Sequence, residues 1–517
     1  MNFEFNDETK FSKLKNSLLV SINTEDFLNS VKCKCAGDCK SAIKQAEEHY
    51  DFNGKKGQIC ITSESRGNID KSIIFVGLGK EKDLNETLAQ EIGAKILDYT
   101  KAHKIKSVSI TLNTSICCDN LLTYSTKVGE YKVADMLSNI AFGISLQAYG
   151  FNKYYTGKRL EKKLCCVKEI EFLCKDSKIA EEKYAELDMV KENVFFCRDL
   201  VNEPANVLNP ESYADICRDL MKLGIEVEVF GEEKMTELGM YSLLGVGQGS
   251  DFESQLVIMK WNGSKNKDEK PVAFVGKGIT FDSGGISLKP SGHIEDMKID
   301  MGGSAVVTSL MRLLAMRKAN VNAIGVVALV ENMPSSKAQR PGDVIKSLSG
   351  QTIEVLNTDA EGRLILADAL YYTVEQFKPK TLIDLATLTG AVLIALGESK
   401  AGVFSNNDKL VKEIEDASKE TGEGVWRMPL SKIGEGYDLL IESDIADMRN
   451  IGINRMAGSI TAGQFLQRFI NNHTKWAHID IAGVACVERP KFFVKKGPSG
   501  FGVRLLDRMV RDVYEDK

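Results

Sequence analysis

Two glycine-containing stretches, residues 272–303 and 357–363, concentrate the side chains that could do chemistry. The charged residues that stand out are Lys277, Asp282, Lys289 and Asp300 in the first stretch, and Asp359, Glu361 and Arg363 in the second. Four carboxylates that converge on one site would repel one another unless cations lay between them. Two divalent ions would balance the four negative charges, and a pair of metal ions is a recurring hydrolytic device. The spacing therefore points to metal-assisted hydrolysis.

The same residues also allow other interpretations. Asp and Asn favour helix caps and turns, and that role is adequate for any one of these residues taken alone. For the whole set, with Lys277, Lys289 and Arg363 interleaved among the carboxylates, a functional site is favoured. The carboxylates alone would equally permit a two-metal phosphohydrolase, which stays open as an alternative reaction.

Both charged stretches follow apolar runs of the kind expected for buried strands. Val272–Val275 precedes the first loop, and Thr352–Leu356 precedes the second. The pattern over 363–377 predicts a helix, so that the second loop lies at its N-terminus. Ligands in open α/β sheets bind beyond the carboxyl ends of strands. We therefore expect the two loops to build one site.

The segments GKGITFDSGGISLKP and NTDAEGRLILADAL resemble the leucine aminopeptidase, or cytosol aminopeptidase, family of metallopeptidases (family M17). Further similar segments are DLATLTGA, RMAGSITAGQFLQRF, WAHIDIAGVA and GFGVRLL. The resemblance covers about residues 190–510, and the earlier part of the chain is similar only in general layout. It implies a cytoplasmic aminopeptidase that releases leucine and other apolar residues from peptides with a free N-terminus.

The resemblance also implies roles for individual residues. One divalent ion would be held by Lys277, Asp282, Asp300 and Glu361, and the other by Asp282, Asp359 and Glu361. The ions would be Mn²⁺ or Zn²⁺, with Mg²⁺ as a further option, because carboxylate-rich sites suit these metals. As a ligand, the Lys277 amine must lose its proton, which two adjacent dications would promote. Lys289 would stay protonated and stabilise the oxyanion.

Arg363 and the substrate pocket complete the implied site. By resemblance, Arg363 would hold a bicarbonate ion that relays a proton, and a salt bridge to a neighbouring carboxylate is its alternative role. The first substrate side chain would be lined by Met297, Thr387, Leu388 and Gly390, for which ordinary core packing is the alternative. The five histidines are scattered, and His293 is interpreted as a loop residue rather than a ligand.

A chain of 517 residues exceeds what one core usually supports, so two α/β domains are expected. The predicted borders are 1–170 for an N-terminal domain, 171–190 for a linker helix, and 191–517 for a three-layer α/β/α catalytic domain with a mostly parallel central sheet. In the N-terminal domain the apolar spacing predicts strands at 18–22, 58–61, 73–76 and 108–112 and helices at 85–103 and 127–148. By resemblance this domain is macro-domain-like and organises a homohexamer.

The net charge and the lack of long apolar runs argue against nucleic-acid and membrane partners. A formal net charge of −5 gives no electrostatic reason to expect nucleic acid, although some bacterial members of the family bind DNA, and a DNA-binding role is the alternative function. No signal peptide and no run of 18 apolar residues is visible, so no membrane partner is expected. The cysteines are interpreted as reduced, because adjacent pairs such as Cys117-Cys118 do not resemble a secreted disulfide framework. Cys33, Cys35 and Cys39 lack the CxxC spacing of a zinc ribbon, so a metal clip is not favoured.

Overall fold

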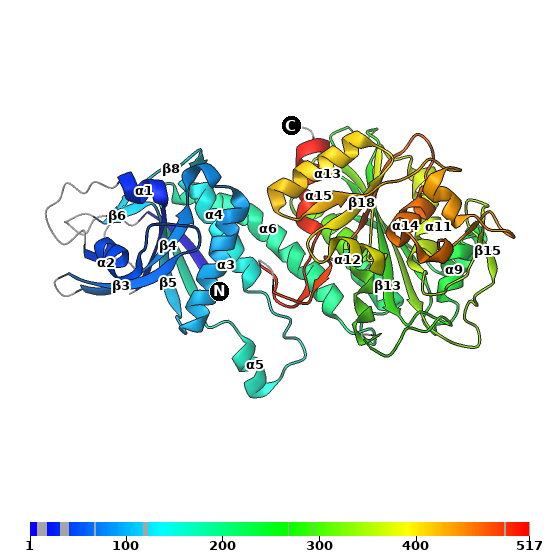
Figure 1. The fold of residues 1–517 in the computed structure, drawn as a ribbon, viewed down its shortest axis with the longest axis horizontal. Coiled ribbons are helices and arrows are strands. Elements are labelled where there is room, and N and C mark those ends of the chain that lie inside the picture. The colour runs from blue at the N-terminus through cyan, green and yellow to red at the C-terminus, as the bar shows by residue number, and fades with distance from the viewer. Residues whose placement is uncertain are drawn as a thin grey trace. The chain divides into compact units, whose positions relative to one another are not determined.

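The computed structural model describes residues 1–7, 18–30, 41–66, 69–116, 122–266, 268–292, 294–490 and 493–515. The chain forms two compact units, residues 1–191 with 491–495, and residues 192–490 with 496–517. Helix α6 (Ser177–Asn202) begins in the first unit and ends in the second (Figure 1). Strand β10 (Glu169–Leu173) belongs to the sheet of the first unit, so the border expected after residue 170 falls inside a strand.

The first unit is built on a six-stranded sheet. Its strands lie in the order β1 (Asn2–Asn6), β10, β5 (Ser107–Leu112), β2 (Leu18–Thr24), β4 (Ile69–Gly79) and β3 (Ile59–Arg66). All neighbours are parallel except β3 and β4. Helices α3 (Glu86–Ala102) and α4 (Val133–Gln147) share one core with Val20, Ile22 and Ile110, while Ala46 of helix α2 (Ser41–Tyr50) packs with Leu19 and Phe75. The alternating strand residues thus fill two cores, one on each face.

The helix ends in this unit follow local chemistry. Helix α3 begins after Asn85, whose side chain caps the helix by accepting a hydrogen bond from the Leu88 amide at 2.8 Å. The helix predicted over 127–148 begins only at Val133. Residues 127–132 instead form a hairpin of β8 (Lys127–Val128) and β9 (Tyr131–Lys132), in which Gly129 adopts a φ of +57°. The predicted helix was therefore too long at its N-terminal end, because the apolar spacing used to predict it continued through this hairpin.

The second unit is built on an eight-stranded sheet. Its strands lie in the order β11 (Glu226–Phe230), β12 (Gln255–Asn262), β14 (Asn322–Asn332), β13 (Val272–Asp282), β17 (Thr381–Ala386), β21 (Lys475–Asp480), β18 (Ala401–Ser405) and β19 (Val425–Arg427). The four central strands β14, β13, β17 and β21 run parallel and are almost wholly buried. Continuous apolar strands of this kind occur where both faces of a sheet are covered.

Helices cover both faces of the large sheet, as Figure 1 shows. Helices α10 (Gly302–Met316), α13 (Asp408–Thr421) and α15 (Val503–Met509) pack in one group, and α9 (Tyr241–Gly247), α11 (Gly362–Phe377) and α14 (Gly458–Gln467) in another. The two-domain α/β fold predicted from the sequence, with its three-layer second domain, is confirmed. Among the described residues, the continuous helical segment Ile294–Met316 is long and apolar enough to cross a membrane, but 83% of its most apolar window is buried in the protein, as in a core helix.

Two details of the predicted strands were wrong. Strand β13 does not end at Val275 but continues to Asp282, so Lys277 and Asp282 lie in the strand rather than in a loop. Strand β16 (Thr352–Glu354) lies outside the large sheet, in a three-stranded sheet with β15 (Val344–Lys346) and β20 (Met448–Arg449). The second charged loop therefore reaches the site from a separate small sheet.

Candidate metal centre

Lys277 lies in the middle of strand β13, and its side chain is nearly solvent-excluded. Its Nζ atom lies 2.8 Å from Asp300 Oδ2 and 2.8 Å from Glu361 Oε1, and it donates a hydrogen bond to the Thr387 carbonyl oxygen at 2.9 Å. Burial favours the neutral amine, but the carboxylates of Asp300, Glu361 and Asp282 outweigh burial and raise the pKa of Lys277. The ammonium group thus occupies a position built for a cation.

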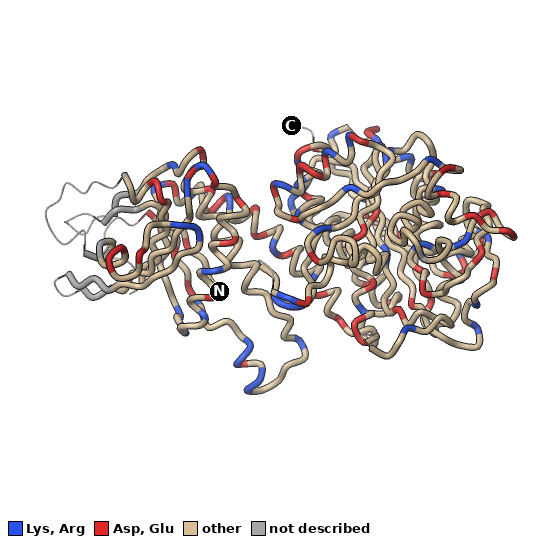
Figure 2. Tube along the Cα trace, viewed as in Figure 1, with Lys and Arg blue, Asp and Glu red and all other residues tan. Residues whose placement is uncertain are grey.

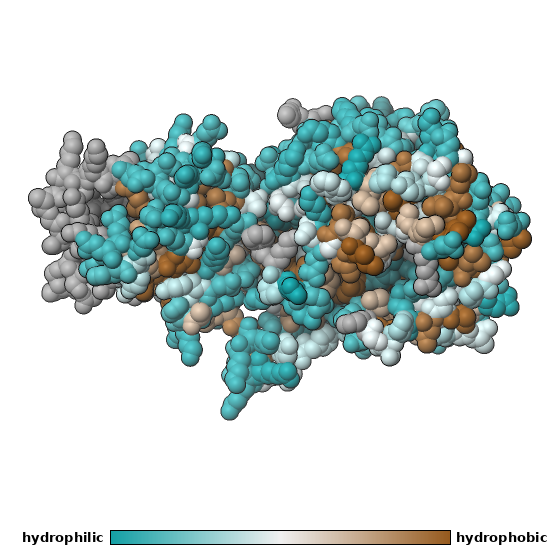
Figure 3. Space-filling model, in the orientation of Figure 1, coloured by the Kyte–Doolittle hydropathy of each residue, from teal (hydrophilic) through white to brown (hydrophobic). Residues whose placement is uncertain are grey.

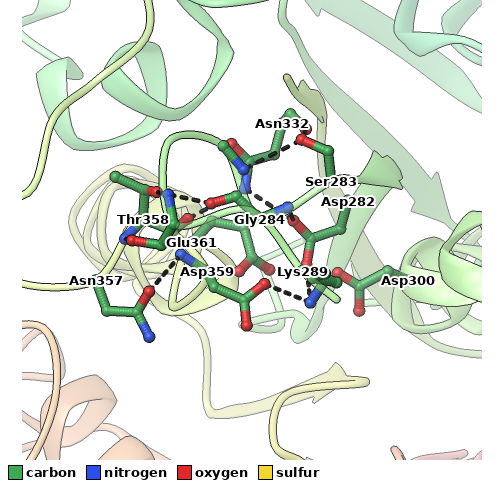
Figure 4. Close-up of polar contacts among 12 residues, drawn as sticks. Asp282, Ser283, Gly284, Lys289, Asp300, Asn332, Asn357, Thr358, Asp359 and Glu361 are labelled. Atoms are coloured by element: carbon green, nitrogen blue, oxygen red, sulfur yellow. Dashed lines mark hydrogen bonds and ion pairs between the residues drawn. The ribbon is translucent and has the colours of Figure 1, made fainter. Parts of the chain in front are cut away.

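Lys289 makes corresponding contacts with Asp282 and Asp359 (Figure 4). Its Nζ atom lies 2.8 Å from Asp282 Oδ2 and 2.5 Å from Asp359 Oδ1. The loop that carries Lys289 leaves strand β13 through Gly284, whose φ of +88° lies in the left-handed region that favours glycine. Burial is again outweighed by the carboxylates of Asp282 and Glu361, which raise the pKa of Lys289.

The carboxylates come from three different parts of the second unit. Asp282 ends strand β13, Asp300 lies in the 3₁₀ segment η5 (Ile294–Met301), and Asp359 and Glu361 precede helix α11. One oxygen each from Asp282, Asp359 and Glu361 lies within 4.8 Å of the others. The buried oxygens Asp300 Oδ2, Asp359 Oδ1 and Glu361 Oε1 form ion pairs with the lysine ammonium groups. Oxygens arranged in this way are suited to cations.

The charge balance of the cluster supports the same conclusion. Four carboxylates against the ammonium groups of Lys277 and Lys289 leave a formal charge of −4 + 2 = −2. Burial and the repulsion from Glu361 raise the pKa of Asp282 to about 6, although Lys289 and Lys277 act against this rise. Buried charges in proteins are normally paired or coordinate metals. Carboxylate oxygens and an amine nitrogen form a donor set that fits divalent ions such as Mn²⁺, Mg²⁺ or Zn²⁺.

Arg363 lies in the first turn of helix α11 and is 7% exposed. Its Nε atom has no hydrogen-bond partner, and the guanidinium forms no ion pair with any residue that the structure describes. The salt bridge considered from the sequence is therefore not found among these residues. Burial lowers the pKa of Arg363 to about 10, against the attraction of Glu361 and Asp480. A buried, unpaired cation of this kind is suited to holding an anion.

Of the four predicted pocket residues, Thr387 contacts this cluster. Thr387 joins it directly, since its hydroxyl donates to Asp300 Oδ1 at 2.7 Å. Met297 and Leu388 are half-buried, and Gly390 is exposed at the start of helix α12 (Gly390–Leu396). His293 and the cysteines at 33, 35 and 39 lie outside the described residues.

Two residues at the site were missed from the sequence. Asn332 ends strand β14 and donates a hydrogen bond to Asp282 Oδ1 at 2.8 Å. Asp480 ends strand β21 and accepts hydrogen bonds from the Leu388 amide at 3.0 Å and the Thr389 hydroxyl at 2.7 Å. Each is the polar last residue of a buried strand, and this signal could have identified both of them.

Comparisons with known protein families and structures show that the protein is a peptide hydrolase of the aminopeptidase type. The model of the cytosol aminopeptidase family catalytic domain matches residues 195–507, and the model of the N-terminal domain of that family matches residues 24–158. The chain belongs to the cytosol aminopeptidase family, which confirms the resemblance seen in the sequence.

Individual relatives are similar over nearly the whole chain. A probable cytosol aminopeptidase of Caulobacter vibrioides is 56% identical over 476 residues, which cover 92% of each chain. One from Wolbachia pipientis is 48% identical and covers 92% of this chain and 90% of its own. A tomato leucine aminopeptidase mutant has a TM-score of 0.81 at 31% identity, covering 99% of this chain and 96% of that one. The bottromycin maturation enzyme BotP in complex with Mn has a TM-score of 0.78 at 29% identity, covering 96% and 99%.

Proposed function

We propose that the protein is a metal-dependent aminopeptidase that uses two divalent ions per chain and releases N-terminal leucine and other apolar residues from peptides. The observation that carries this proposal is the cluster of Asp282, Asp359 and Glu361. One oxygen of each lies within 4.8 Å of the others, and all three carboxylates contact lysine ammonium groups. The Mn complex of BotP supports Mn²⁺ as one suitable metal, with Zn²⁺ or Mg²⁺ as the others.

The residues that would hold the ions are Lys277, Asp282, Asp300, Asp359 and Glu361. When bound, the two ions supply Lewis acidity and an activated water for attack on the peptide carbonyl. Lys277 would then serve as a neutral amine, because nearby dications favour loss of its proton. The carbonyl oxygen of Thr387, which accepts a hydrogen bond from Lys277 Nζ, would orient that amine.

Lys289 and Arg363 would act on the substrate side. In the metal-free cluster the carboxylates around Lys289 raise its pKa, and Lys289 would remain the cation that stabilises the oxyanion formed from the scissile carbonyl. Arg363 would hold a bicarbonate ion as the proton acceptor, which suits a buried guanidinium without an ion pair among the described residues. Met297, Thr387, Leu388 and Gly390 would line the pocket for the first side chain of the substrate.

We further propose that the enzyme acts in the cytoplasm as a homohexamer. Helix α12 carries Leu393 at 45% and Ile394 at 89% exposure, and Figure 3 shows hydrophobic residues gathered over this helix. An exposed apolar patch is typical of an interaction surface. A second copy of the chain is the partner proposed for it, consistent with the assembly expected from the family resemblance.

A DNA-binding role is less well supported. Figure 2 shows Lys and Arg interspersed with Asp and Glu along the described trace, and the net charge is −5. Non-specific binding of nucleic acid rests on concentrated positive charge, which releases counterions. Retention on a heparin column that falls with rising salt would support a DNA-binding role.

The proposed reaction is tested with matched leucyl substrates. The protein, stripped of metal with EDTA and reconstituted with Mn²⁺, should hydrolyse a leucyl anilide but not the same anilide with an acetylated amine, because the free amine is expected to bind one of the ions. It should leave a phosphate ester intact. Equal cleavage of the free and acetylated anilides would remove the aminopeptidase assignment. Cleavage of the phosphate ester alone would favour the phosphohydrolase alternative.

A further inference from the structure

Asn332 is the last residue of strand β14, after a run of buried apolar residues. In the parallel register it pairs with Asp282, the last residue of strand β13, because a bulge between Ile279 and Phe281 brings the two strand ends level. The Asn332 side chain is almost fully buried, with 4% of the residue exposed. A buried carboxamide at this point must find hydrogen-bond partners within the site.

The Asn332 carboxamide uses its nitrogen to contact two segments at once (Figure 4). Nδ2 donates to Asp282 Oδ1 at 2.8 Å and to the Thr358 carbonyl oxygen at 3.1 Å. A carboxamide nitrogen has two N–H donors, so both are used. Since both partners can only accept, the amide orientation is determined: an oxygen in this place would face two other oxygens.

These contacts distinguish the two oxygens of Asp282. Oδ1 accepts from Asn332 and also from the Gly284 amide at 2.9 Å, whereas Oδ2 lies 2.8 Å from the Lys289 ammonium group. One oxygen is therefore held by protein donors, and the other is left to face a cation. Rotation of the Asp282 carboxylate would break the hydrogen bonds to Oδ1.

The second hydrogen bond of the Asn332 side chain, to the Thr358 carbonyl oxygen, holds the loop that carries Asp359. Thr358 directly precedes Asp359, and its hydroxyl donates to the Gly284 carbonyl oxygen at 2.6 Å. The backbone carbonyl of Asn332 accepts hydrogen bonds from the Ser283 amide at 3.0 Å and from the Ser283 hydroxyl at 2.8 Å. Asn332 thus joins the end of strand β13, the loop after it, and the loop that carries Asp359.

We propose that Asn332 is a positioning residue for the metal centre, which fixes Asp282 Oδ2 and the Asp359 carboxylate in one geometry for binding divalent ions. This inference rests on the proposed function. Residues that hold metal ligands by hydrogen bonds typically change metal affinity by about 10- to 100-fold when they are mutated. Asn332 need not touch an ion to have this effect, because it acts through Asp282 and Thr358.

The test compares Asn332 with a matched asparagine at the opposite end of the same strand. Asn322 is 7% exposed, donates from Nδ2 to the carbonyl oxygens of Asn266 and Glu269, and accepts from the Ser264 amide. Asn332→Ala and Asn322→Ala both remove buried hydrogen bonds from strand β14, and both should lower the melting temperature of the metal-free protein. Only Asn332→Ala should change the Mn²⁺ dissociation constant, measured by equilibrium dialysis against metal-free full-length protein.

The expected result is Mn²⁺ binding weakened by about 10- to 100-fold in Asn332→Ala and changed by less than about twofold in Asn322→Ala. Asn332→Leu, which keeps most of the side-chain volume without the donors, should behave like Asn332→Ala and serves if the alanine variant does not fold. Wild-type Mn²⁺ affinity in a folded Asn332 variant would overturn the inference and leave the proposed function intact. A wild-type protein that binds no Mn²⁺, Zn²⁺ or Mg²⁺ would instead overturn the proposed function, and this inference with it.

Discussion

Lys277 Nζ lies 2.8 Å from Glu361 Oε1, although Lys277 belongs to the middle of strand β13 and Glu361 is the residue that precedes helix α11. Both side chains are 3% exposed. A buried charge without a partner is strongly destabilising, so each of the two groups depends on the other. The strand and the helix are therefore joined at the centre of the site by a cation and an anion. Under the proposed function a bound divalent ion would replace this ion pair, because Lys277 would then act as a neutral amine ligand.

Lys277 and Lys289 should differ in what their removal does. Lys277→Ala leaves Asp300 and Glu361 buried without their cation, so both metal content and stability should fall, the latter by about 3–5 kcal/mol in the metal-free protein. Lys289→Ala should keep both ions and lose about 10²- to 10³-fold in kcat, which is typical for one oxyanion donor. Metal content measured by titration, and kcat measured at saturating metal, distinguish the two variants. If both variants titrate alike, the roles of the two lysines are misassigned.

Gly362 should tolerate no side chain, because the Lys277 side chain passes against it. A Cβ atom at this position would lie 2.6 Å from both Cδ and Cε of Lys277. Gly362→Ala should therefore displace Lys277 and reduce metal content and activity, with an overpacking penalty of about 1–3 kcal/mol, although alanine favours a helix more than glycine does. Gly292→Ala is the matched control, since nothing lies within 4 Å of its Cβ position. Metal analysis and thermal melting of the two variants make the comparison, and equal behaviour would contradict the packing argument.

Much of the fold could be predicted because its strands are apolar runs and its helices have regular apolar spacing. The prediction that strand β13 stops at Val275 failed for a physical reason. Gly276 and the charged Lys277 look like the start of a loop, but Gly276 is required where helix α10 approaches, as a Cβ atom there would lie 2.6 Å from Ser304 Cα. The charge of Lys277 is balanced by Asp300 and Glu361, which lie far away in the sequence and cannot be seen in a local pattern.

The candidate site was largely predictable, whereas the residues that hold it in place were not. Its charged residues stand out because lysines and aspartates in glycine-containing stretches are poor core material. Asn332 carries no such signal beyond its place at the end of a strand, since its partners Asp282 and Thr358 are fixed only by strand register and tertiary folding. The separate sheet was missed because only β16 lies in an apolar run, whereas its partners β15 and β20 are too short to show one.

The exposed face of helix α12 should take part in assembly. Ile394→Glu places a charge on a residue that is 89% exposed, so the fold of the single chain should be unaffected while association is weakened. Sedimentation equilibrium at micromolar concentration should show a hexamer for the wild type and for the conservative Ile394→Val, and smaller species for Ile394→Glu. A wild-type protein that is fully active at the 57.1 kDa mass of one chain would show that activity does not require assembly.

The number of metal ions bound per chain tests the central claim most directly. Metal-free protein is titrated with Mn²⁺, and bound metal and leucyl anilide hydrolysis are measured on the same samples. The wild type should approach two ions per chain as activity reaches its maximum. Asp282→Ala and Glu361→Ala, each of which removes a ligand assigned to both ions, should bind less metal and be inactive. Full activity with no bound metal, or near-normal activity and full metal content in either variant, would contradict the two-metal aminopeptidase.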